Sequence, residues 1–147
     1  MKSIFFDEIE NTQDHAINEF KDEPLLIVSK AQTAGRGTDK NKWENADQSL
    51  AASLAFNKEI VNFKKTLVPL LAGYSFISLH QIEDLKLKWP NDITLNEDKV
   101  GGVLVEENND LICIGLGINY FWNNPLIPRA GSSVSYTHLR AHETRED

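Results

Sequence analysis

Short apolar segments separated by polar turns fill the second half of the chain, and they constrain its fold more than any other feature. The first segment alternates Leu85 and Leu87 with lysines, which is the period-two pattern of a strand. Further apolar segments follow at 93–95, 100–106 and 111–118, with Asn96-Glu97-Asp98 and Asn108-Asn109-Asp110 between them. Strands joined by such short connections pair as antiparallel hairpins. This region therefore predicts an antiparallel meander.

The first half of the chain supplies the remaining elements. Apolar runs predict strands at 3–6, 25–28 and 50–56. A short helix is expected from about Thr12 to Phe20, after the capping residue type Asn11. A longer, mostly buried helix is expected from Val61 to about Ile82. This order of elements predicts a single α+β domain, with a mostly antiparallel or mixed sheet packed against helices.

Composition and charge exclude several classes of function. A chain of 147 residues fits one domain, and a net charge of −7 argues against a general nucleic-acid binder. No signal peptide and no apolar stretch of membrane-spanning length is recognisable, so we expect a cytoplasmic protein. The single cysteine, Cys113, lies in an apolar run and is expected to be a buried, inert thiol.

A long loop is predicted for residues 32–49, which are rich in Gly, Asn and Asp and show no apolar period. It opens with Gln32-Thr33-Ala34-Gly35-Arg36-Gly37, where two glycines around an arginine let backbone N–H groups approach an anion. Taken alone, a solvated turn explains this segment equally well. It is not a P-loop, because no Gly-Lys-Ser/Thr follows at the required spacing.

Two further segments carry groups suited to phosphate chemistry. Lys88-Trp89-Pro90-Asn91-Asp92 presents an amide beside a carboxylate, which suits a ribose or a magnesium ion. Asn-Asp turns after proline are also frequent without any ligand. Lys99 precedes the bare glycines Gly101 and Gly102 of a predicted strand, where a lysine can neutralise a carboxylate or phosphate. A solvated hairpin lysine is the ordinary alternative.

In combination, these segments resemble the biotin–protein ligase family, which is related to lipoate ligases. The family pattern Gln-x-x-Gly-Arg-Gly with a later tryptophan matches Gln32 to Gly37 and Trp43, and Lys-Trp-Pro-Asn-Asp is intact at Lys88 to Asp92. Lys-x-x-Gly-Val-Leu matches Lys99 to Leu104, and Gly-x-Gly-Ile-Asn matches Gly115 to Asn119. An early Ser-Thr-Asn pattern is found as Asn11-Thr12-Gln13. The resemblance covers residues 4 to about 131.

The resemblance implies a biotin/lipoate ligase-like catalytic domain, similar in fold to class II aminoacyl-tRNA synthetases, that acts on biotin with ATP and Mg²⁺. Biotinoyl-AMP and pyrophosphate would form first, and a lysine of a carrier protein would then displace AMP. The carrier would be the biotin carboxyl carrier domain of acetyl-CoA carboxylase or a related carboxylase. No DNA partner is expected, because no helix-turn-helix precedes Ser3. No membrane partner is expected, and a homodimer stays open.

The same resemblance assigns roles to individual residues. Lys99 and Arg36 are expected to be catalytic, with Lys99 between the biotin carboxylate and the α-phosphate. Biotin would be bound by Asn11, Thr12, Gln13, Gln32, Gly35, Arg36, Gly37, Thr38, Lys99 and Gly102. The nucleotide would be bound by Trp43, Asn91, Asp92 and Asn119, with Asp92 also holding magnesium. The loop from Gly35 to Lys42 is expected to close over the reactive intermediate and exclude water.

The match departs from the family in two respects. The family loop commonly continues Arg-Gly-Arg-Arg-Gly-Arg, and here Thr38 and Asp39 replace two cations. The family domain also continues past Asn119, so we expect residues 1–131 to be a C-terminally truncated catalytic domain and 132–147 a non-native or disordered tail. Two alternatives to a biotin ligase stay open. One is a lipoate or octanoyl transfer enzyme, and the other is a truncated remnant that binds biotin without catalysis.

Overall fold

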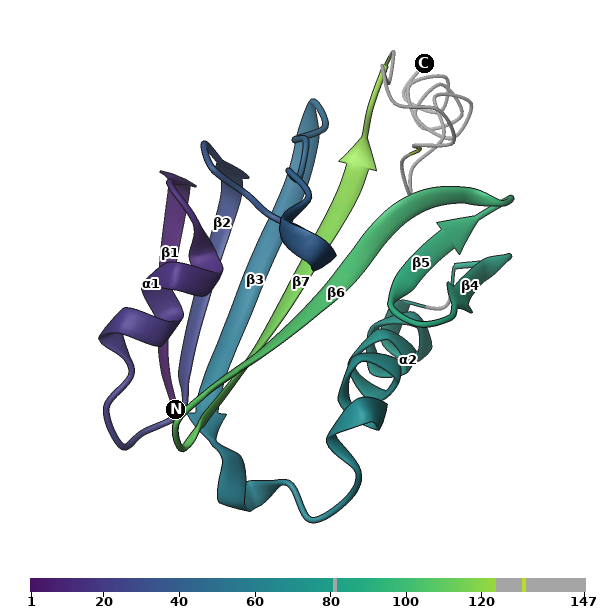
Figure 1. Ribbon diagram of the computed structural model, residues 1–147. Helices are drawn as coiled ribbons and strands as arrows, with labels where there is room; N and C mark the ends of the chain where they lie inside the picture. Colours follow the sequence, from purple (N-terminus) through teal and green to yellow (C-terminus); the bar gives the residue numbers. More distant parts are fainter. Residues whose placement is uncertain (81, 124–130, 132–147) are drawn as a thin grey trace.

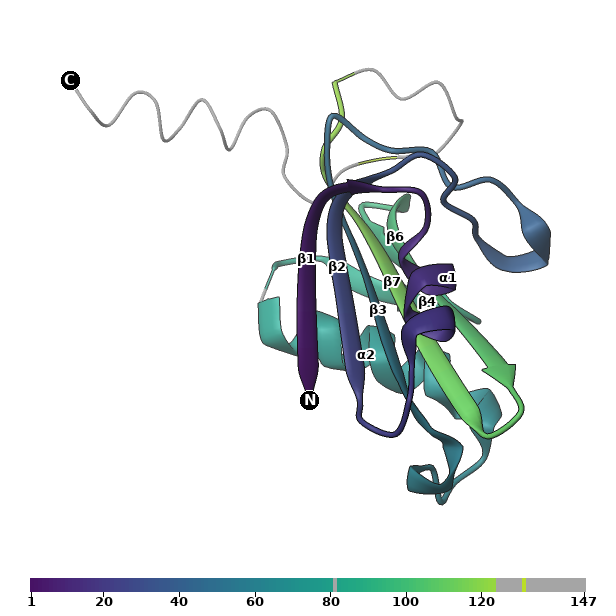
Figure 2. The ribbon, with the colours of Figure 1, turned by 90° about the vertical axis from the view of Figure 1, so that its left-hand side faces the viewer.

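One seven-stranded sheet with a helix on each face forms the body of the protein (Figure 1 and Figure 2). The computed structural model describes residues 1–80, 82–123 and 131, so the expected tail at 132–147 lies outside the described residues. The strands are β1 (Lys2–Ile9), β2 (Leu25–Gln32), β3 (Gln48–Asn57), β4 (Leu85–Lys88), β5 (Asp92–Leu95), β6 (Asp98–Asn108) and β7 (Leu111–Phe121). The helices are α1 (Thr12–Glu19) and α2 (Val68–His80), and 3-10 turns form at η1 (Thr38–Lys40), η2 (Lys58–Ile60) and η3 (Lys65–Leu67).

The strand order is β1-β2-β3-β7-β6-β5-β4. β1 and β2 are parallel and are joined through α1, whereas every other neighbouring pair is antiparallel. The meander predicted from the second half of the chain is β4 to β7. Its last strand also pairs with β3 along ten residue positions, which joins the two halves of the sheet. The predicted α+β class with a mixed, mostly antiparallel sheet is confirmed.

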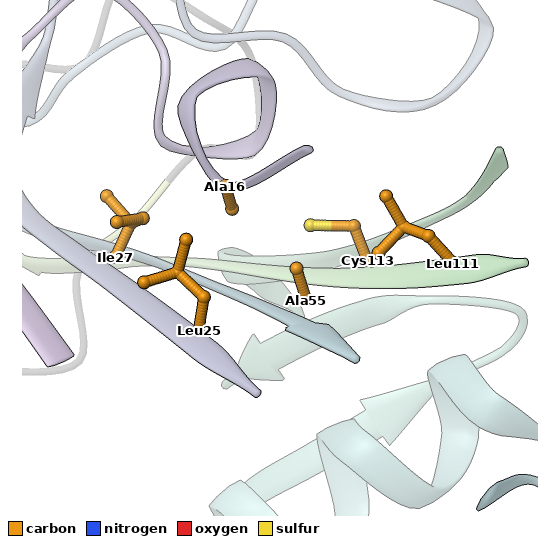
Figure 3. Packing of buried hydrophobic residues seen from close by; sticks show 6 residues of the cluster. All are labelled: Ala16, Leu25, Ile27, Ala55, Leu111 and Cys113. Atoms are coloured by element: carbon orange, nitrogen blue, oxygen red, sulfur yellow. The ribbon is translucent and has the colours of Figure 1, made fainter. Parts of the chain in front are cut away.

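The first core lies between α1 and the β1-β2-β3-β7 half of the sheet. Asn11 caps α1, because its side-chain oxygen accepts a hydrogen bond from the Asp14 backbone N–H at 3.0 Å. The helix turns Ala16 onto the sheet, where this small side chain lets helix and strands approach closely. Figure 3 shows Ala16 above the buried side chains of this core, which are Leu25, Ile27, Ala55, Leu111 and Cys113.

The second core lies on the opposite face, under α2. Its buried members are Phe76, Leu85, Ile93, Val100 and Ile118. Side chains alternate between the two faces along a strand, so Cys113 and Ile118 of β7 point into different cores. Figure 2 shows the two helices on opposite sides of the sheet. The sheet is therefore covered on both faces over part of its area.

The long helix expected from Val61 to Ile82 is wrong in length and in burial. It begins at Val68, after two separate 3-10 turns. Pro69 explains the late start, since proline is tolerated in the first turn of a helix and would clash inside a longer one. Leu71 and Tyr74 are exposed on its outer face. Among the described residues, no helix is long and apolar enough to cross a membrane.

The buried thiol of the first core leads to a chemical prediction. Burial raises the pKa of Cys113 to about 12, so the folded protein keeps this thiol protonated at about pH 8. We expect Ellman's reagent to leave Cys113 unmodified in the native protein and to react with it in urea. Because the folded state holds the proton more tightly, the stabilising contribution is complete below about pH 8.5 and is lost as the pH rises toward 12. Rapid native labelling would contradict this assignment.

Candidate functional site

A hollow of about 490 Å³, part of it open to solvent, lies on the α1 side of the sheet. Its walls come from α1, the loop between β2 and β3, and the strands β3, β6 and β7. The lining residues are Asn11, Thr12, Gln13, Gln32, Arg36, Gly37, Thr38, Trp43, Ala51, Ser53, Asn91, Lys99, Gly102, Val103, Leu104, Gly115, Leu116 and Gly117.

Bare backbone forms the floor of this pocket on β7. A Cβ added to Gly115 would lie 2.5 Å from Oε1 of Gln13, and one added to Gly117 would lie 2.9 Å from the Trp43 ring. Neither distance leaves room for a methyl group, so glycine at both positions lets side chains rest directly on the strand. Gly102 of the neighbouring β6 also faces the Trp43 ring, and a Cβ added there would lie 3.5 Å from it.

A network of uncharged polar side chains closes one end of the pocket. The Thr12 hydroxyl and backbone N–H both donate to Oε1 of Gln32, at 3.0 and 2.8 Å. The Ser53 hydroxyl lies 2.9 Å from the Thr12 hydroxyl and donates to Oε1 of Gln13 at 2.9 Å. The Gln13 amide in turn donates to the Cys113 carbonyl at 3.1 Å. These four side chains are all buried, so they form a fixed set of donors and acceptors.

A cation and an indole ring occupy the other end. The Lys99 ammonium forms an ion pair with Asp92 at 2.8 Å and lies 5.8 Å from the centre of the Trp43 ring. Its side chain is 43% exposed, so the charge can meet a ligand that enters from solvent. Along β7, Gly115 faces Gln13 and Gly117 faces Trp43, and these two glycines are two positions apart. These two positions on the pocket floor are therefore about 7 Å apart.

The loop between β2 and β3 covers the pocket from the α1 side, where Figure 2 shows it standing out from the sheet. Its base is fixed by backbone hydrogen bonds, among them Trp43 N–H to the Gly35 carbonyl at 2.9 Å. The Asn11 amide donates to the Ala34 carbonyl at 2.8 Å. Thr38 and Asp39 at the tip are exposed, and Asp39 adopts a left-handed backbone conformation with φ of 56°. The base of the loop is thus positioned and its tip is open to solvent.

Arg36 lies within this loop and is held by two carboxylates. One terminal nitrogen donates to Glu106 on β6 at 2.5 Å, and the other pairs with Asp14 on α1. The hydrogen bond to Glu106 raises the pKa of the Arg36 guanidinium, and burial acts in the opposite direction. The side chain therefore bridges two elements that flank the pocket.

The structure brings most of the sequence-predicted site residues together. Three of them lie outside the lining, namely Gly35, Asp92 and Asn119. Gly35 packs against Trp43, and Asp92 is paired with Lys99. Asn119 is buried and donates to the Gly131 carbonyl at 3.3 Å, while its side-chain oxygen has no partner within the described part of the chain. Asn91 lines the pocket and donates to the Val103 carbonyl at 3.0 Å.

Sequence reasoning did not place Ser53 in the site. It sits in a strand, Leu50 to Phe56, in which the alternation of Leu50, Ala52 and Leu54 places Ser53 on the opposite face, so no sequence pattern marks it as a buried site residue. Ala51, Val103, Leu104, Gly115, Leu116 and Gly117 also line the pocket without having been assigned a binding role. Among residues 1–80, 82–123 and 131, no group of three or more His, Cys, Asp or Glu could hold a metal ion.

This arrangement defines a class of protein. A buried uncharged polar end, a flat glycine floor and a lysine at the mouth suit a small molecule with a neutral polar head and an anionic tail. The family follows from comparison with known proteins. The chain belongs to the biotin/lipoate A/B protein ligase family, whose model matches residues 5–119.

Individual relatives agree with this assignment. The chain is 30% identical over 128 residues to the bifunctional ligase/repressor BirA of Bacillus subtilis, covering 79% of this chain and 39% of that protein. It is 29% identical over 129 residues to biotin–protein ligase 2 of Arabidopsis thaliana, covering 76% of this chain and 38% of the relative. The chain thus spans about two fifths of the length of these relatives.

Solved structures show the same fold. The biotin acetyl coenzyme A carboxylase synthetase of Helicobacter pylori with bound biotinylated ATP is 32% identical, with a TM-score of 0.76 over 84% of this chain and 63% of that chain. The biotin protein ligase of Aquifex aeolicus in complex with biotin and ATP is 27% identical, with a TM-score of 0.77 over 95% of this chain and 61% of that chain. The biotin/lipoate ligase-like fold expected from the sequence is confirmed.

The contact between Gly117 and Trp43 can be tested without any ligand. In a background with Trp89→Phe and Trp122→Phe, we expect Gly117→Ala to push the Trp43 ring off the floor, because the added methyl would lie within 3.0 Å of ring atoms. Acrylamide should then quench Trp43 fluorescence more strongly. Gly37→Ala is the matched control, since its nearest neighbour would be 3.7 Å away. Equal quenching in both variants would contradict the packing of Trp43 on β7.

Proposed function

We propose that this chain carries the catalytic site of a biotin–protein ligase, which joins biotin to ATP as biotinoyl-AMP and transfers biotin to a carrier lysine. The observation that carries the proposal is the polarity of the pocket, with buried uncharged groups at one end and Lys99 at the other. Biotin has a ureido ring with two N–H donors and a carbonyl acceptor, and its valerate tail ends in a carboxylate. Both ends of the molecule match the ends of the pocket.

The uncharged end favours biotin over lipoate. Thr12, Gln13, Gln32 and Ser53 hold hydroxyl and amide groups in a buried position, where an apolar ligand would leave their remaining hydrogen-bonding capacity unused. Sites built to hydrogen-bond a polar group discriminate strongly against analogues that lack it. The dithiolane ring of lipoate offers no N–H or carbonyl group. This end of the pocket therefore supports a ureido ligand.

The cationic end suits the activation step. A carboxylate oxygen must attack the α-phosphorus of ATP, and pyrophosphate leaves with the electron pair of the broken P–O bond. Two anionic groups approach one another in this step, so a fixed cation between them lowers the barrier. We assign this role to Lys99, which Asp92 and the Trp43 ring hold at the mouth of the pocket. The carrier amine then attacks the mixed anhydride and AMP departs.

Asn91 and Asp92 are assigned to the nucleotide and its magnesium ion. Magnesium in nucleotide sites usually takes one or two carboxylates, with substrate phosphates and water as the other ligands. Asp92 is a half-buried carboxylate beside Lys99, which fits this demand, and Asn91 lines the pocket next to it. Trp43 is assigned to cover the adenylate. Its ring already lies over Gly102 and Gly117.

The partner in the second step is assigned by chemistry and by relatives. The biotin–[acetyl-CoA-carboxylase] ligase of Paracoccus denitrificans is 28% identical to the chain over 103 residues. A biotin carboxyl carrier domain of such a carboxylase is therefore the proposed acceptor, in the cytoplasm.

Titration calorimetry tests the ligand assignment directly. We expect biotin to bind the protein with a measurable heat and lipoic acid to bind at least about a hundredfold more weakly, since its ring cannot use the remaining hydrogen-bonding capacity of the buried polar groups. Dethiobiotin, which keeps the ureido group, is the matched control and should bind. If lipoic acid binds as tightly as biotin, the pocket belongs to a lipoate or octanoyl transfer enzyme. If none of the three binds, the proposed function is wrong.

The catalytic assignment of Lys99 is tested by substitution. We expect Lys99→Ala to lower biotin-dependent pyrophosphate release by on the order of a hundredfold or more, because one cation that stabilises the transition state is lost. Lys86→Ala is the control, since Lys86 is an exposed lysine on the short strand β4. Both variants should melt near the parent temperature. Normal pyrophosphate release by a folded Lys99→Ala protein would remove Lys99 from the mechanism.

A further inference from the structure

We propose that Asp14 and Glu106 are positioning residues that clamp Arg36 and thereby hold the turn from Gly35 to Gly37 beside the uncharged end of the pocket. The proposal rests on the proposed function only for the identity of the ligand. It changes the role expected for Arg36 from the sequence, because the guanidinium is engaged by the protein itself.

The clamp connects α1 and β6, the two elements that flank the uncharged end of the pocket. Asp14 follows Gln13 directly on α1, and Glu106 pairs in register with Cys113, whose carbonyl accepts the Gln13 amide. Arg36 reaches Glu106 at 2.5 Å and also bonds Asp14. A guanidinium that bridges two carboxylates fixes its own orientation, since both hydrogen bonds point along the planar fork. These two contacts therefore fix the position of the loop relative to the side chains that line the pocket.

The charges of the clamp leave Arg36 little capacity for a phosphate. Two carboxylates surround one guanidinium, so the group carries a net charge of −1 when all three are ionised. An approaching polyphosphate would meet two anions beside this one cation. Among the described residues Lys99 has a single carboxylate partner, so its neighbourhood there is less negative. Lys99 is therefore the better-placed cation for the α-phosphate.

Burial makes Glu106 the stronger half of the clamp. Arg36 and Glu106 are each 30% exposed, whereas Asp14 is 55% exposed. The second oxygen of Glu106 is buried without a hydrogen-bond partner in the described part of the chain. Such a carboxylate depends on Arg36 for compensation, and removing the arginine would leave a stranded charge. Neutral replacements of the carboxylates therefore test the clamp more cleanly than removal of Arg36.

The first measurement needs no ligand. We expect Glu106→Gln and Asp14→Asn to speed backbone hydrogen exchange across residues 35–43 by about tenfold and about threefold, while β3 and β7 stay protected. The amides of Gly37 and Trp43, which bond to Asn41 and Gly35, are the natural reporters. Asp110→Asn is the matched control, because the exposed Asp110 pairs with Lys58 in the turn between β6 and β7, outside the loop. Unchanged exchange in both clamp variants would overturn the proposal.

The second measurement separates positioning from direct phosphate binding. We expect Glu106→Gln and Asp14→Asn to bind biotin about three- to thirtyfold more weakly than the parent. The double variant Arg36→Gln with Glu106→Gln should bind biotin no more weakly than the weaker-binding of these two single variants, since the residues act as a unit. If Arg36 instead binds phosphate, the carboxylate variants will bind ATP more tightly and biotin as before, which would overturn the clamp. Faster exchange with unchanged biotin affinity would also refute a positioning role. Should the parent protein bind no biotin, the proposed function fails, and hydrogen exchange alone still decides whether the clamp exists.

Discussion

Strand β7 has two faces that serve different purposes, and the rest of the molecule depends on keeping them apart. Leu111 and Cys113 point into the core under α1, whereas Ile112 and Ile118 are buried on the side of α2. The glycines of the pocket floor continue the α1 face. A shift of one residue in the pairing with β3 or β6 would exchange these faces, burying the floor and exposing the core. Pairing on both edges of β7 holds the register.

Much of this arrangement was readable in the sequence. The alternation from Leu85 onward predicted the meander, and the resemblance to the biotin–protein ligase family implied that Gln32 and Lys99 belong to one site. The length of α2 was misjudged because apolar spacing was followed across Pro69, where chain geometry overrides periodicity. Contacts between distant residues could not be predicted in the same way. Ser53 joins the polar network only because β3 packs beside α1. No local sequence pattern predicts that β3 and α1 are in contact.

The loop over the pocket shows how charge is distributed around the pocket. Its tip carries Thr38 and Asp39 where the family pattern has cations, and its pocket-lining cation Arg36 is paired with Asp14 and Glu106. Lys99 comes from a strand, and its partner Asp92 comes from the next strand along the sheet. A cation fixed on a strand keeps its position when a loop moves. The electrostatics of this pocket therefore depend more on the sheet than on the covering loop.

The sheet order also determines when the pocket can form. Gln13 donates a hydrogen bond to the carbonyl of Cys113 on β7. Strand β3 has β2 on one edge, and its other edge is paired only after β7 has been added. The two partners of that hydrogen bond are 100 residues apart, so loop closure over most of the chain precedes the pairing. During synthesis, β1, β2 and β3 leave the ribosome well before the strand that completes them. Until then β3 presents an unpaired edge, which is the segment most open to pairing with another chain.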